Sequence, residues 1–282
     1  MPRVAVVTGA NKGIGYQIVK LLARSKTQDD DIVYLTSRDE SRGRAAVDAL
    51  KRDEGVDALF HQLDLDSQDS VDSLAAFLKA HHQGGIDILV NNAGIAYKRD
   101  STAPFDEQAR VTCATNFFGT LRVCDALIPL LRDGGRVVHV SSQVGHMNFA
   151  RLSPDLRQRF NSPDLTKDDL VSMITSFVNA AQTNSHEAQG WSNSAYGISK
   201  IGVTALCRIQ QRDYDAAHPG NDVIFGACCP GFCDTDMTSH KGPRPAEEGA
   251  DVAAFLATLP PKSAATRGTF WYDRKELPWK IE

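Results

Sequence analysis

The sequence predicts an α/β fold: a doubly wound sheet of seven parallel strands covered by helices on both faces. Two observations lead to this prediction. Short runs rich in valine, isoleucine and leucine alternate with helix-length amphipathic segments almost from end to end of the 282 residues. Several of these runs are continuously apolar, which is typical of parallel strands that are buried on both faces.

Seven runs are expected to form the strands, and the segments between them should form the helices that connect parallel neighbours. The strand runs are RVAVVTG, DIVYLTSR, ALFHQLDL, IDILVNNAG, GRVVHVSS, DVIFGACCPG and GTFWYD. Apolar residues recur with helical spacing in GYQIVKLLARSK, SVDSLAAFLKAHH and EGADVAAFLATL. Because no repeat or low-complexity linker interrupts the order, we expect a single domain over residues 1–282.

One segment breaks the alternation of strand and helix. Residues 143–193 separate GRVVHVSS from SAYGISK, where one short connection would suffice. Within this segment, SPDLRQRF and LTKDDLVSMITSFVNAAQ are expected to be helical, each opened by a serine or threonine cap. The sequence therefore predicts a helical insertion on one side of the sheet.

Composition argues against several classes of protein. With 31 Lys and Arg against 35 Asp and Glu, the net charge of −4 leaves no dominant basic patch, so nucleic acid is not the expected partner. Neither a signal peptide nor a membrane-spanning run is recognisable, so we expect a cytoplasmic protein without membrane contact. The six cysteines and eight histidines show no metal-ligand spacing, so no metal is expected. Cys229 and Cys233 flank a loop in which they could be exposed.

A glycine-rich loop follows the first expected strand. In TGANKGIG, Gly9, Gly13 and Gly15 permit a tight turn and let backbone N–H groups approach a pyrophosphate at a helix N-terminus. Three glycines could also make no more than a sharp turn, but their place in a βαβ pattern favours nucleotide binding. The other residues of the loop expected to contact the nucleotide are Asn11, Lys12 and Ile14.

The end of the second expected strand indicates which nucleotide is bound. Arg38 follows that strand directly, Arg42 lies four residues on, and Lys12 is a third cation. A guanidinium matches a 2′-phosphate in charge and in the geometry of its donors, which favours NADP(H). Alternatively the arginines are solvated helix-start residues, and Asp39 could bind the ribose of NAD instead.

A tyrosine and a lysine in SNSAYGISK are candidates for acid–base chemistry. Tyr196 and Lys200, at positions i and i+4, should share one face of a helix. A nearby ammonium is expected to lower the phenol pKa from about 10, which would make the pair a general acid or base. Such a pair alone is commonly found on a protein surface without a catalytic role. Three further polar segments accompany it: the serines at 141–142, Asn116 in a helix-like stretch, and NNAG at 91–94.

Together these motifs resemble the short-chain dehydrogenase/reductase family. TGANKGIG, NNAG, Asn116, the two serines, YGISK and PGFCDTDM stand in the family's order with compatible spacing over nearly the whole chain. The resemblance implies a Rossmann-like sheet and hydride transfer between a nicotinamide and a carbonyl or alcohol. It also implies that Ser142, Tyr196 and Lys200 form the catalytic group, assisted by Asn116.

The resemblance further implies a role for each residue. Tyr196 would protonate the developing alkoxide, and Ser142, rather than Ser141, would hydrogen-bond the substrate oxygen. Lys200 would lower the pKa of Tyr196 and hold the nicotinamide ribose, while Asn116 would support Lys200 through a water. Cofactor contacts beyond the glycine loop are implied for Asp64, Leu65, Asn92, Ala93, Gly94, Pro230, Gly231 and Thr235.

Within the family, the chain resembles the monomeric, NADPH-dependent carbonyl reductases of ketones, aldehydes and quinones. The shared segments are ANKGIG, LFHQLDLD, TNFFGT, ACCPG and EGA, together with the insertion before the tyrosine. Phe232 and Cys233 depart from the subgroup's pattern in a loop that borders the substrate pocket, so this departure bears on the range of substrates.

The insertion raises the question of assembly. Many members of the family assemble through helices that flank the active-site strands, and helices of the insertion could cover that surface. We therefore expect a monomer, the alternative being a lid with no bearing on assembly. Phe149, Trp191 and Phe232 are candidates for gripping flat apolar substrates, although ordinary packing would explain each of them equally well.

Three other functions fit parts of the pattern. A dehydrogenase of a specific sterol, prostaglandin or other alcohol would use the same residues in the reverse direction. A sensor that binds NADP(H) without turnover would not need the proton donor. A methyltransferase is disfavoured by Arg38 and by the lack of an acidic residue directly ending the second strand. The sequence thus predicts a small carbonyl compound as substrate and NADPH or NADP⁺ as cofactor.

Overall fold

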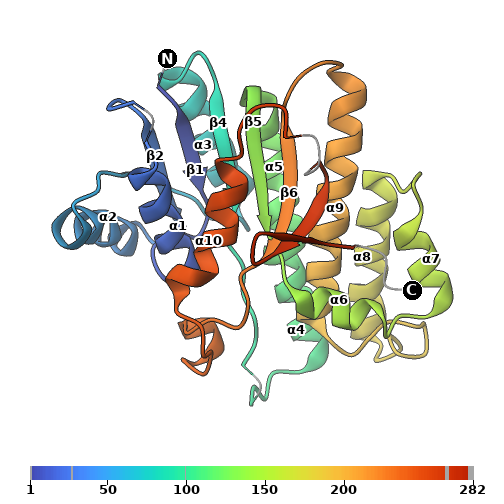
Figure 1. The fold of residues 1–282 in the computed structure, drawn as a ribbon. Coiled ribbons are helices and arrows are strands. Elements are labelled where there is room, and N and C mark those ends of the chain that lie inside the picture. The colour runs from blue at the N-terminus through green and yellow to red at the C-terminus, as the bar shows by residue number, and fades with distance from the viewer. Residues whose placement is uncertain (1, 27, 99, 264–266, 279–282) are drawn as a thin grey trace.

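In the part of the chain that the structure describes, eight strands form one central sheet. The computed structural model describes residues 2–278 except 27, 99 and 264–266. The strand order is β3-β2-β1-β4-β5-β6-β7-β8. The central strands β2, β1, β4, β5 and β6 are labelled in this order in Figure 1. The strands are β1 (Val4–Val7), β2 (Ile32–Ser37), β3 (Leu59–Gln62), β4 (Ile86–Asn91), β5 (Leu131–Val140), β6 (Ile224–Cys229), β7 (Thr269–Tyr272) and β8 (Lys275–Leu277). All seven strands expected from the sequence are present, and they pair in parallel.

The eighth strand is an addition that the sequence did not reveal. β8 pairs antiparallel with β7 through a tight turn at Asp273 and Arg274, both of which have positive φ. Such a turn is usually signalled by asparagine or glycine, and this one carries neither at its centre. With only three residues, β8 is also too short to show an alternating pattern. The sheet is therefore seven parallel strands with one antiparallel strand at its edge.

Helices cover both faces of the sheet (Figure 1). Each face has its own apolar core. One face carries α1 (Gly13–Arg24), α2 (Glu40–Glu54) and α10 (Ala246–Ala257). The opposite face carries α3 (Gln68–His81), α5 (Thr120–Leu127) and α9 (Ala195–Ala217). Four further helical segments are α4 (Phe105–Cys113) and the π-helix η1 (Ala114–Gly119), which lead into α5, and the 3-10 helices η2 (Ile128–Leu130), before β5, and η3 (Asp236–Thr238), after β6. The doubly wound architecture is confirmed.

The expected insertion forms three helices rather than two. They are α6 (Gln143–Phe149), α7 (Pro154–Asn161) and α8 (Lys167–Gln182). The two predicted helices begin at the predicted caps: the Ser153 hydroxyl accepts from the N–H of Leu156, and the Thr166 hydroxyl accepts from that of Asp169. α6 was not predicted, because it exposes Val144 and Met147 and so lacks an apolar stripe on a buried face.

A third apolar core lies between the insertion and the sheet layers. α8 packs against α4 and α9, and the cluster includes Phe160 and Phe177. Phe149 and Trp191 are part of the same cluster and are only 1% and 4% exposed. The prediction that these two rings grip substrate is therefore wrong, because both are used to attach the insertion.

The sheet order places the functional motifs along one edge, formed by the carboxyl ends of the parallel strands. β1 lies between β2 and β4, so the chain leaves β1 toward one side and later returns on the other. Ligands of open α/β sheets bind at such a point, off the carboxyl ends of the strands. The glycine loop after β1, the NNAG segment after β4, the serines after β5 and the loop after β6 all follow these ends.

Candidate active site

Tyr196 and Lys200 lie on the first turns of α9, as their spacing predicted. The helix is capped by Ser194, whose hydroxyl accepts from the N–H of Gly197 at 3.0 Å. The Lys200 ammonium lies 5.6 Å from the centroid of the Tyr196 ring. Its Nζ donates to the carbonyl oxygen of Val140, the last residue of β5, at 2.7 Å. The pair is thus fixed against the end of the sheet.

Burial governs the titration of both groups. It raises the pKa of Tyr196 to about 12, although a hydrogen bond with the Ser142 side chain opposes the rise. Burial also lowers the pKa of Lys200 to about 8, because the side chain is 4% exposed. The expected lowering of the phenol pKa does not occur in the chain by itself, because burial is the largest cause of the shift and raises the pKa. The ammonium lies over the ring and bonds Val140, so loss of water around the hydroxyl is the larger effect.

The two adjacent serines after β5 have different partners. The Ser141 hydroxyl donates to the Lys200 carbonyl at 3.0 Å and is 2.7 Å from the hydroxyl of Thr204, so it joins β5 to α9. The Ser142 side chain faces Tyr196 and also accepts from the N–H of Val144 at 3.1 Å. Ser142 is therefore the serine whose hydroxyl lies beside the phenol.

Asn116 lies in the π-helix η1, and its amide has three partners. Its oxygen accepts from the N–H of Ile95 at 2.7 Å, while its nitrogen donates to the Ile95 carbonyl at 2.9 Å and to the Ser199 hydroxyl at 3.0 Å. A Cβ on Gly94 would lie 3.2 Å from the Asn116 oxygen and 3.6 Å from the Lys200 nitrogen. A π-helical turn is often found at a functional site, and here it brings Asn116 beside Lys200.

The glycine loop is held against the segment that follows β4. The Asn92 side chain donates to the carbonyl oxygens of Thr8 and Gly9 at 2.9 and 3.0 Å. Gly9 has a φ of +61°, and a Cβ there would lie only 2.7 Å from the Cα of Ala93. The N-cap residue of α1, Lys12, makes no side-chain capping bond, and no acidic residue stands in the first turn of the helix. This helix start therefore suits a phosphate group.

The end of β2 presents positive charge. Arg38 and Arg42 are exposed there. The Asp39 carboxylate, by contrast, caps α2 by accepting from the N–H of Arg42 and from the Ser41 hydroxyl, both at 2.9 Å. These bonds hold the pKa of Asp39 below its usual value. Since the acidic residue is engaged by its own helix, the residues present fit a nucleotide with a 2′-phosphate better than one with a free ribose hydroxyl.

The other predicted cofactor residues lie around the same edge. Asp64 accepts from the N–H of Asp66 at 3.1 Å, and Leu65 is buried. In the loop after β6, Gly231 adopts a φ of +84°, and the methyl group of Thr235 would lie 3.4 Å from a Cβ on Gly13. The loop after β6 therefore touches the glycine loop.

The two cysteines of that loop are not exposed. Cys229 and Cys233 are 3% and 1% exposed, so the expectation of accessible thiols is wrong. The thiol of Cys233 donates to the Pro230 carbonyl at 3.2 Å and packs so closely on Gly249 that a side chain there would clash with it. α10 covers this thiol, and the sequence alone did not show that contact.

Comparison with known proteins places the chain in a family. The sequence profile described as short chain dehydrogenase matches residues 3–154. The rat protein named carbonyl reductase [NADPH] 3 is 46% identical over 277 residues, which cover 98% of each chain. The human protein named carbonyl reductase [NADPH] 1 is 45% identical over 276 residues, again 98% of each. This chain belongs to the short-chain dehydrogenase family.

Two solved structures of plant enzymes share the fold of this short-chain dehydrogenase. Salutaridine reductase from Papaver somniferum has a TM-score of 0.83 at 30% identity, covering 95% of this chain and 99% of its own. Menthone neomenthol reductase from Mentha piperita has a TM-score of 0.79 at 30% identity, covering 98% and 100%.

This short-chain dehydrogenase also has exposed apolar side chains beside Ser142 and in the loop after β6, and most of them were missed from the sequence. Val144 and Met147 stand on α6, directly after Ser142, and Phe232 and Met237 stand in the loop after β6. Their exposed fractions are between 36% and 60%. Only Phe232 was expected. Exposed apolar residues in a helix that the pattern did not predict are the signal that could have revealed the others.

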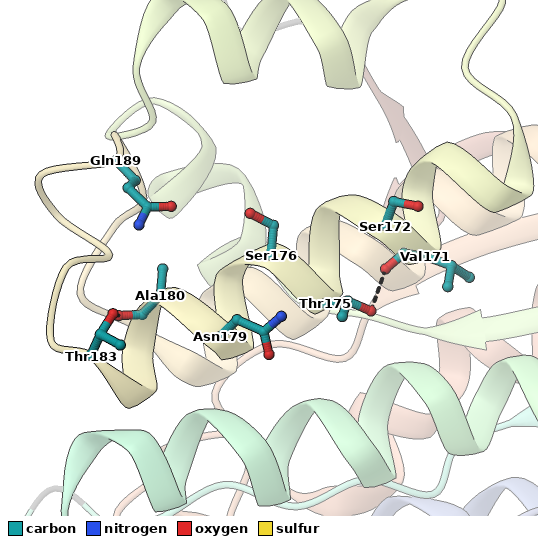
Figure 2. Close-up of a pocket in the computed structure, with 8 residues that line it drawn as sticks. All are labelled: Val171, Ser172, Thr175, Ser176, Asn179, Ala180, Thr183 and Gln189. Carbon is teal, nitrogen blue, oxygen red and sulfur yellow. Dashed lines mark hydrogen bonds between the residues drawn. The ribbon is translucent and has the colours of Figure 1, made fainter.

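A separate groove lies on the outer face of the insertion (Figure 2). Eight residues of α8 and the following loop line it, and most are uncharged and polar. None of the catalytic candidates lines this groove. In the part of the chain that the structure describes, no group of three or more potential metal ligands occurs, and no helix has the length and apolar character needed to cross a membrane.

Proposed function

We propose that this chain reduces ketones, aldehydes and quinones to alcohols with NADPH. The observation that carries the proposal is the contact of Tyr196 with Ser142 beside Lys200, at the edge where the glycine loop and the exposed Arg38 and Arg42 meet. The relatives that are 45–46% identical over 98% of the chain carry the name carbonyl reductase [NADPH].

Tyr196 is the proton donor in this proposal. When bound, the nucleotide supplies the hydride. With a pKa of about 12, the phenol keeps its proton at neutral pH and can give it to an oxygen that becomes more basic during the reaction. The Ser142 hydroxyl beside it would hydrogen-bond the same oxygen. A protonated phenol suits reduction, since oxidation of an alcohol would need the phenolate.

Lys200 and Asn116 have supporting roles in this proposal. The ammonium of Lys200, with a pKa of about 8, still carries its charge at pH 7 and would stabilise the phenolate that remains after proton transfer. Asn116 anchors the segment after β4 through the backbone of Ile95. Its amide oxygen and the Lys200 ammonium both border the Cα of Gly94. Asn116 would therefore position the lysine and its water.

The apolar side chains around the site suggest the kind of carbonyl compound. Val144, Met147, Phe232 and Met237 offer flexible and aromatic surface to a substrate but no charge. A bulky apolar carbonyl compound would bury this surface, whereas a small charged keto acid would find no partner among these four. We therefore propose apolar aromatic or polycyclic carbonyl compounds as the preferred substrates.

We further propose that residues 1–282 form one domain, that 143–193 is an insertion within it, and that the protein is a monomer. α8 packs on α4 and α9 and buries apolar side chains that would otherwise face a partner. Light scattering should give a mass near 30.7 kDa, and a mass of twice that value would reject the monomer. All six cysteines are reduced and buried, which supports a cytoplasmic location.

The function is tested by following nucleotide oxidation by absorbance with a panel of quinones, aromatic aldehydes and ketones. NADPH and NADH are compared side by side, and a charged keto acid is included. We expect turnover with NADPH and apolar carbonyl compounds. Binding of NADPH without turnover of any compound would contradict a broad reductase, and oxidation of alcohols with NADP⁺ would then be measured.

A further inference from the structure

The loop between β6 and α10 keeps its shape through its own hydrogen bonds. At its base, the N–H of Asp234 donates to the carbonyl of Arg244 at 2.7 Å. Inside it, the Thr238 hydroxyl donates to the Cys233 carbonyl at 2.6 Å, and the N–H of His240 donates to the Thr235 carbonyl at 3.0 Å. The loop is therefore a folded unit that presents its side chains from a defined backbone.

This loop makes an ionic contact with the glycine loop. The Lys12 nitrogen lies 2.6 Å from one carboxylate oxygen of Asp236. The other oxygen of Asp236 lies 3.0 Å from Nε2 of His240, whose Nδ1 is 2.6 Å from Asp234. Asp236 is thus held from both sides, and its carboxylate stays close to Lys12. The His240 ring that holds it has a raised pKa because of these two carboxylates.

The contact involves one of the three cations expected to receive the 2′-phosphate. Arg38 and Arg42 are contributed by the end of β2 and the start of α2, and Arg42 pairs with the neighbouring carboxylate of Asp39. Lys12 instead pairs with a residue 224 positions away, in the loop after β6. A phosphate that approaches Lys12 must therefore displace Asp236 or lie beside its negative charge. Displacement of Asp236 loses its attraction to Lys12, and a phosphate beside Asp236 is repelled by a like charge, so either event is unfavourable.

The same contact does not oppose a nucleotide without the 2′-phosphate. The ribose of NADH presents neutral hydroxyl groups, so it neither competes for the ammonium nor meets repulsion from the carboxylate. We propose that Asp236 competes with the 2′-phosphate for Lys12 and thereby limits how strongly this chain prefers NADPH to NADH. This inference rests on the proposed use of NADPH and assigns Asp236 as a residue that sets nucleotide specificity.

The test is the binding of both nucleotides to the full chain, measured by isothermal titration calorimetry. In Asp236→Asn, the Kd for NADPH should fall about two- to fivefold, the range expected for an exposed ion pair, while the Kd for NADH stays unchanged. The NADH titration also shows that the variant is folded. In a Lys12→Met background, the same Asp236→Asn change should have no effect on the Kd for NADPH, because the ammonium for which Asp236 and the phosphate compete is absent.

Asp234→Asn is the matched control. It removes a carboxylate of equal charge from the same loop and from the same histidine, but from a residue that does not bond Lys12. If Asp234→Asn tightens NADPH as much as Asp236→Asn does, a general charge effect replaces the proposed competition. Weaker binding of NADPH to Asp236→Asn would also overturn the inference, since Asp236 would then position Lys12 for the phosphate.

The remaining outcomes separate this inference from the function on which it rests. If the unaltered chain binds NADPH no better than NADH, the proposed function fails. If the unaltered chain prefers NADPH and Asp236→Asn leaves the ratio of the two Kd values unchanged, only the inference fails.

Discussion

The carbonyl oxygen of Val140 accepts a hydrogen bond from the ammonium of Lys200 at 2.7 Å. This bond joins the end of β5 to the second turn of α9, and the hydroxyl of Ser141 makes a parallel link to the carbonyl of Lys200. Together they fix the helix that carries Tyr196 relative to the strand that leads to Ser142. The positions of the Tyr196 phenol and the Ser142 hydroxyl are thus set by the backbone of these elements. Proton transfer requires groups that are held this precisely.

Removal of the phenol hydroxyl tests the assignment of Tyr196. Tyr196→Phe should lower kcat by about 10²- to 10⁴-fold, the usual contribution of a positioned proton donor. Its Kd for NADPH and its melting temperature should stay close to those of the unaltered chain. Tyr97→Phe serves as the control, because it removes a hydroxyl that bonds Glu107 instead. Near-normal turnover by Tyr196→Phe would exclude Tyr196 as the acid.

A second prediction concerns the energetic cost of Lys200. Its folded pKa of about 8 lies below the value of about 10.4 in unfolded chains, and this difference corresponds to about 3 kcal/mol at pH 7. Lys200→Met removes that cost and also the hydrogen bond to Val140, which contributes about 1 kcal/mol. The variant should therefore be more stable than the parent by about 2 kcal/mol and yet be inactive.

Urea unfolding as a function of pH checks the sign of this effect. Between pH 8 and 10.4 the unfolded lysine binds more protons than the folded one, so the stability of the parent rises with pH. The difference in unfolding free energy between Lys200→Met and the parent should therefore decrease over the same pH range. A variant that is less stable than the parent at pH 7 would show that the buried ammonium is well compensated.

The sequence predicted most of the fold because the signals were local. Seven strands were marked by apolar runs, and Ser153 and Thr166 marked two helix starts by chemistry within four residues of the cap. β8 and α6 were not predicted because neither has an apolar stripe. The turn before β8 also adopts positive φ at Asp273 and Arg274 without a glycine.

The predicted site residues were brought to one edge, but their environment depended on distant elements. The pKa of Tyr196 is set by burial among segments far away in the sequence, which no local motif encodes. Cys233 is buried by α10. Trp191 packs against Phe160 of α7 and Phe177 of α8. Each is a contact with a separate element, and a pattern of residue types along one element cannot show which other element will cover it.

The charge at the end of β2 yields a third prediction. Replacing Arg38 and Arg42 by glutamine should raise the Kd for NADPH about tenfold or more, since each lost charge-assisted hydrogen bond is worth about 1.5–3 kcal/mol. The Kd for NADH should change far less. Arg44→Gln is the matched control, because its guanidinium pairs with Glu40 at 2.7 Å in the same helix. Equal losses for both nucleotides would exclude the arginines as the 2′-phosphate site.

The last prediction concerns a buried histidine on β5. His139 is fully buried, its Nε2 lies 2.9 Å from the Gln210 amide oxygen, and its Nδ1 is 3.4 Å from the Asn91 amide nitrogen. Burial lowers its pKa to about 4. In the unfolded chain the pKa is about 6.5, so acid should favour unfolding between pH 6.5 and 4.

The size of this effect follows from the two pKa values. Between pH 7.5 and 5, His139 should lower the free energy of unfolding by about 2 kcal/mol, because the imidazole becomes protonated in the unfolded state and stays neutral in the folded state. His139→Gln keeps a polar side chain that can bond Gln210 but does not titrate. Its unfolding free energy should therefore fall by about 2 kcal/mol less than that of the parent over this interval, even if the variant is weaker at pH 7.5. Parallel losses in the two proteins would mean that the imidazole stays accessible to protons in the folded chain.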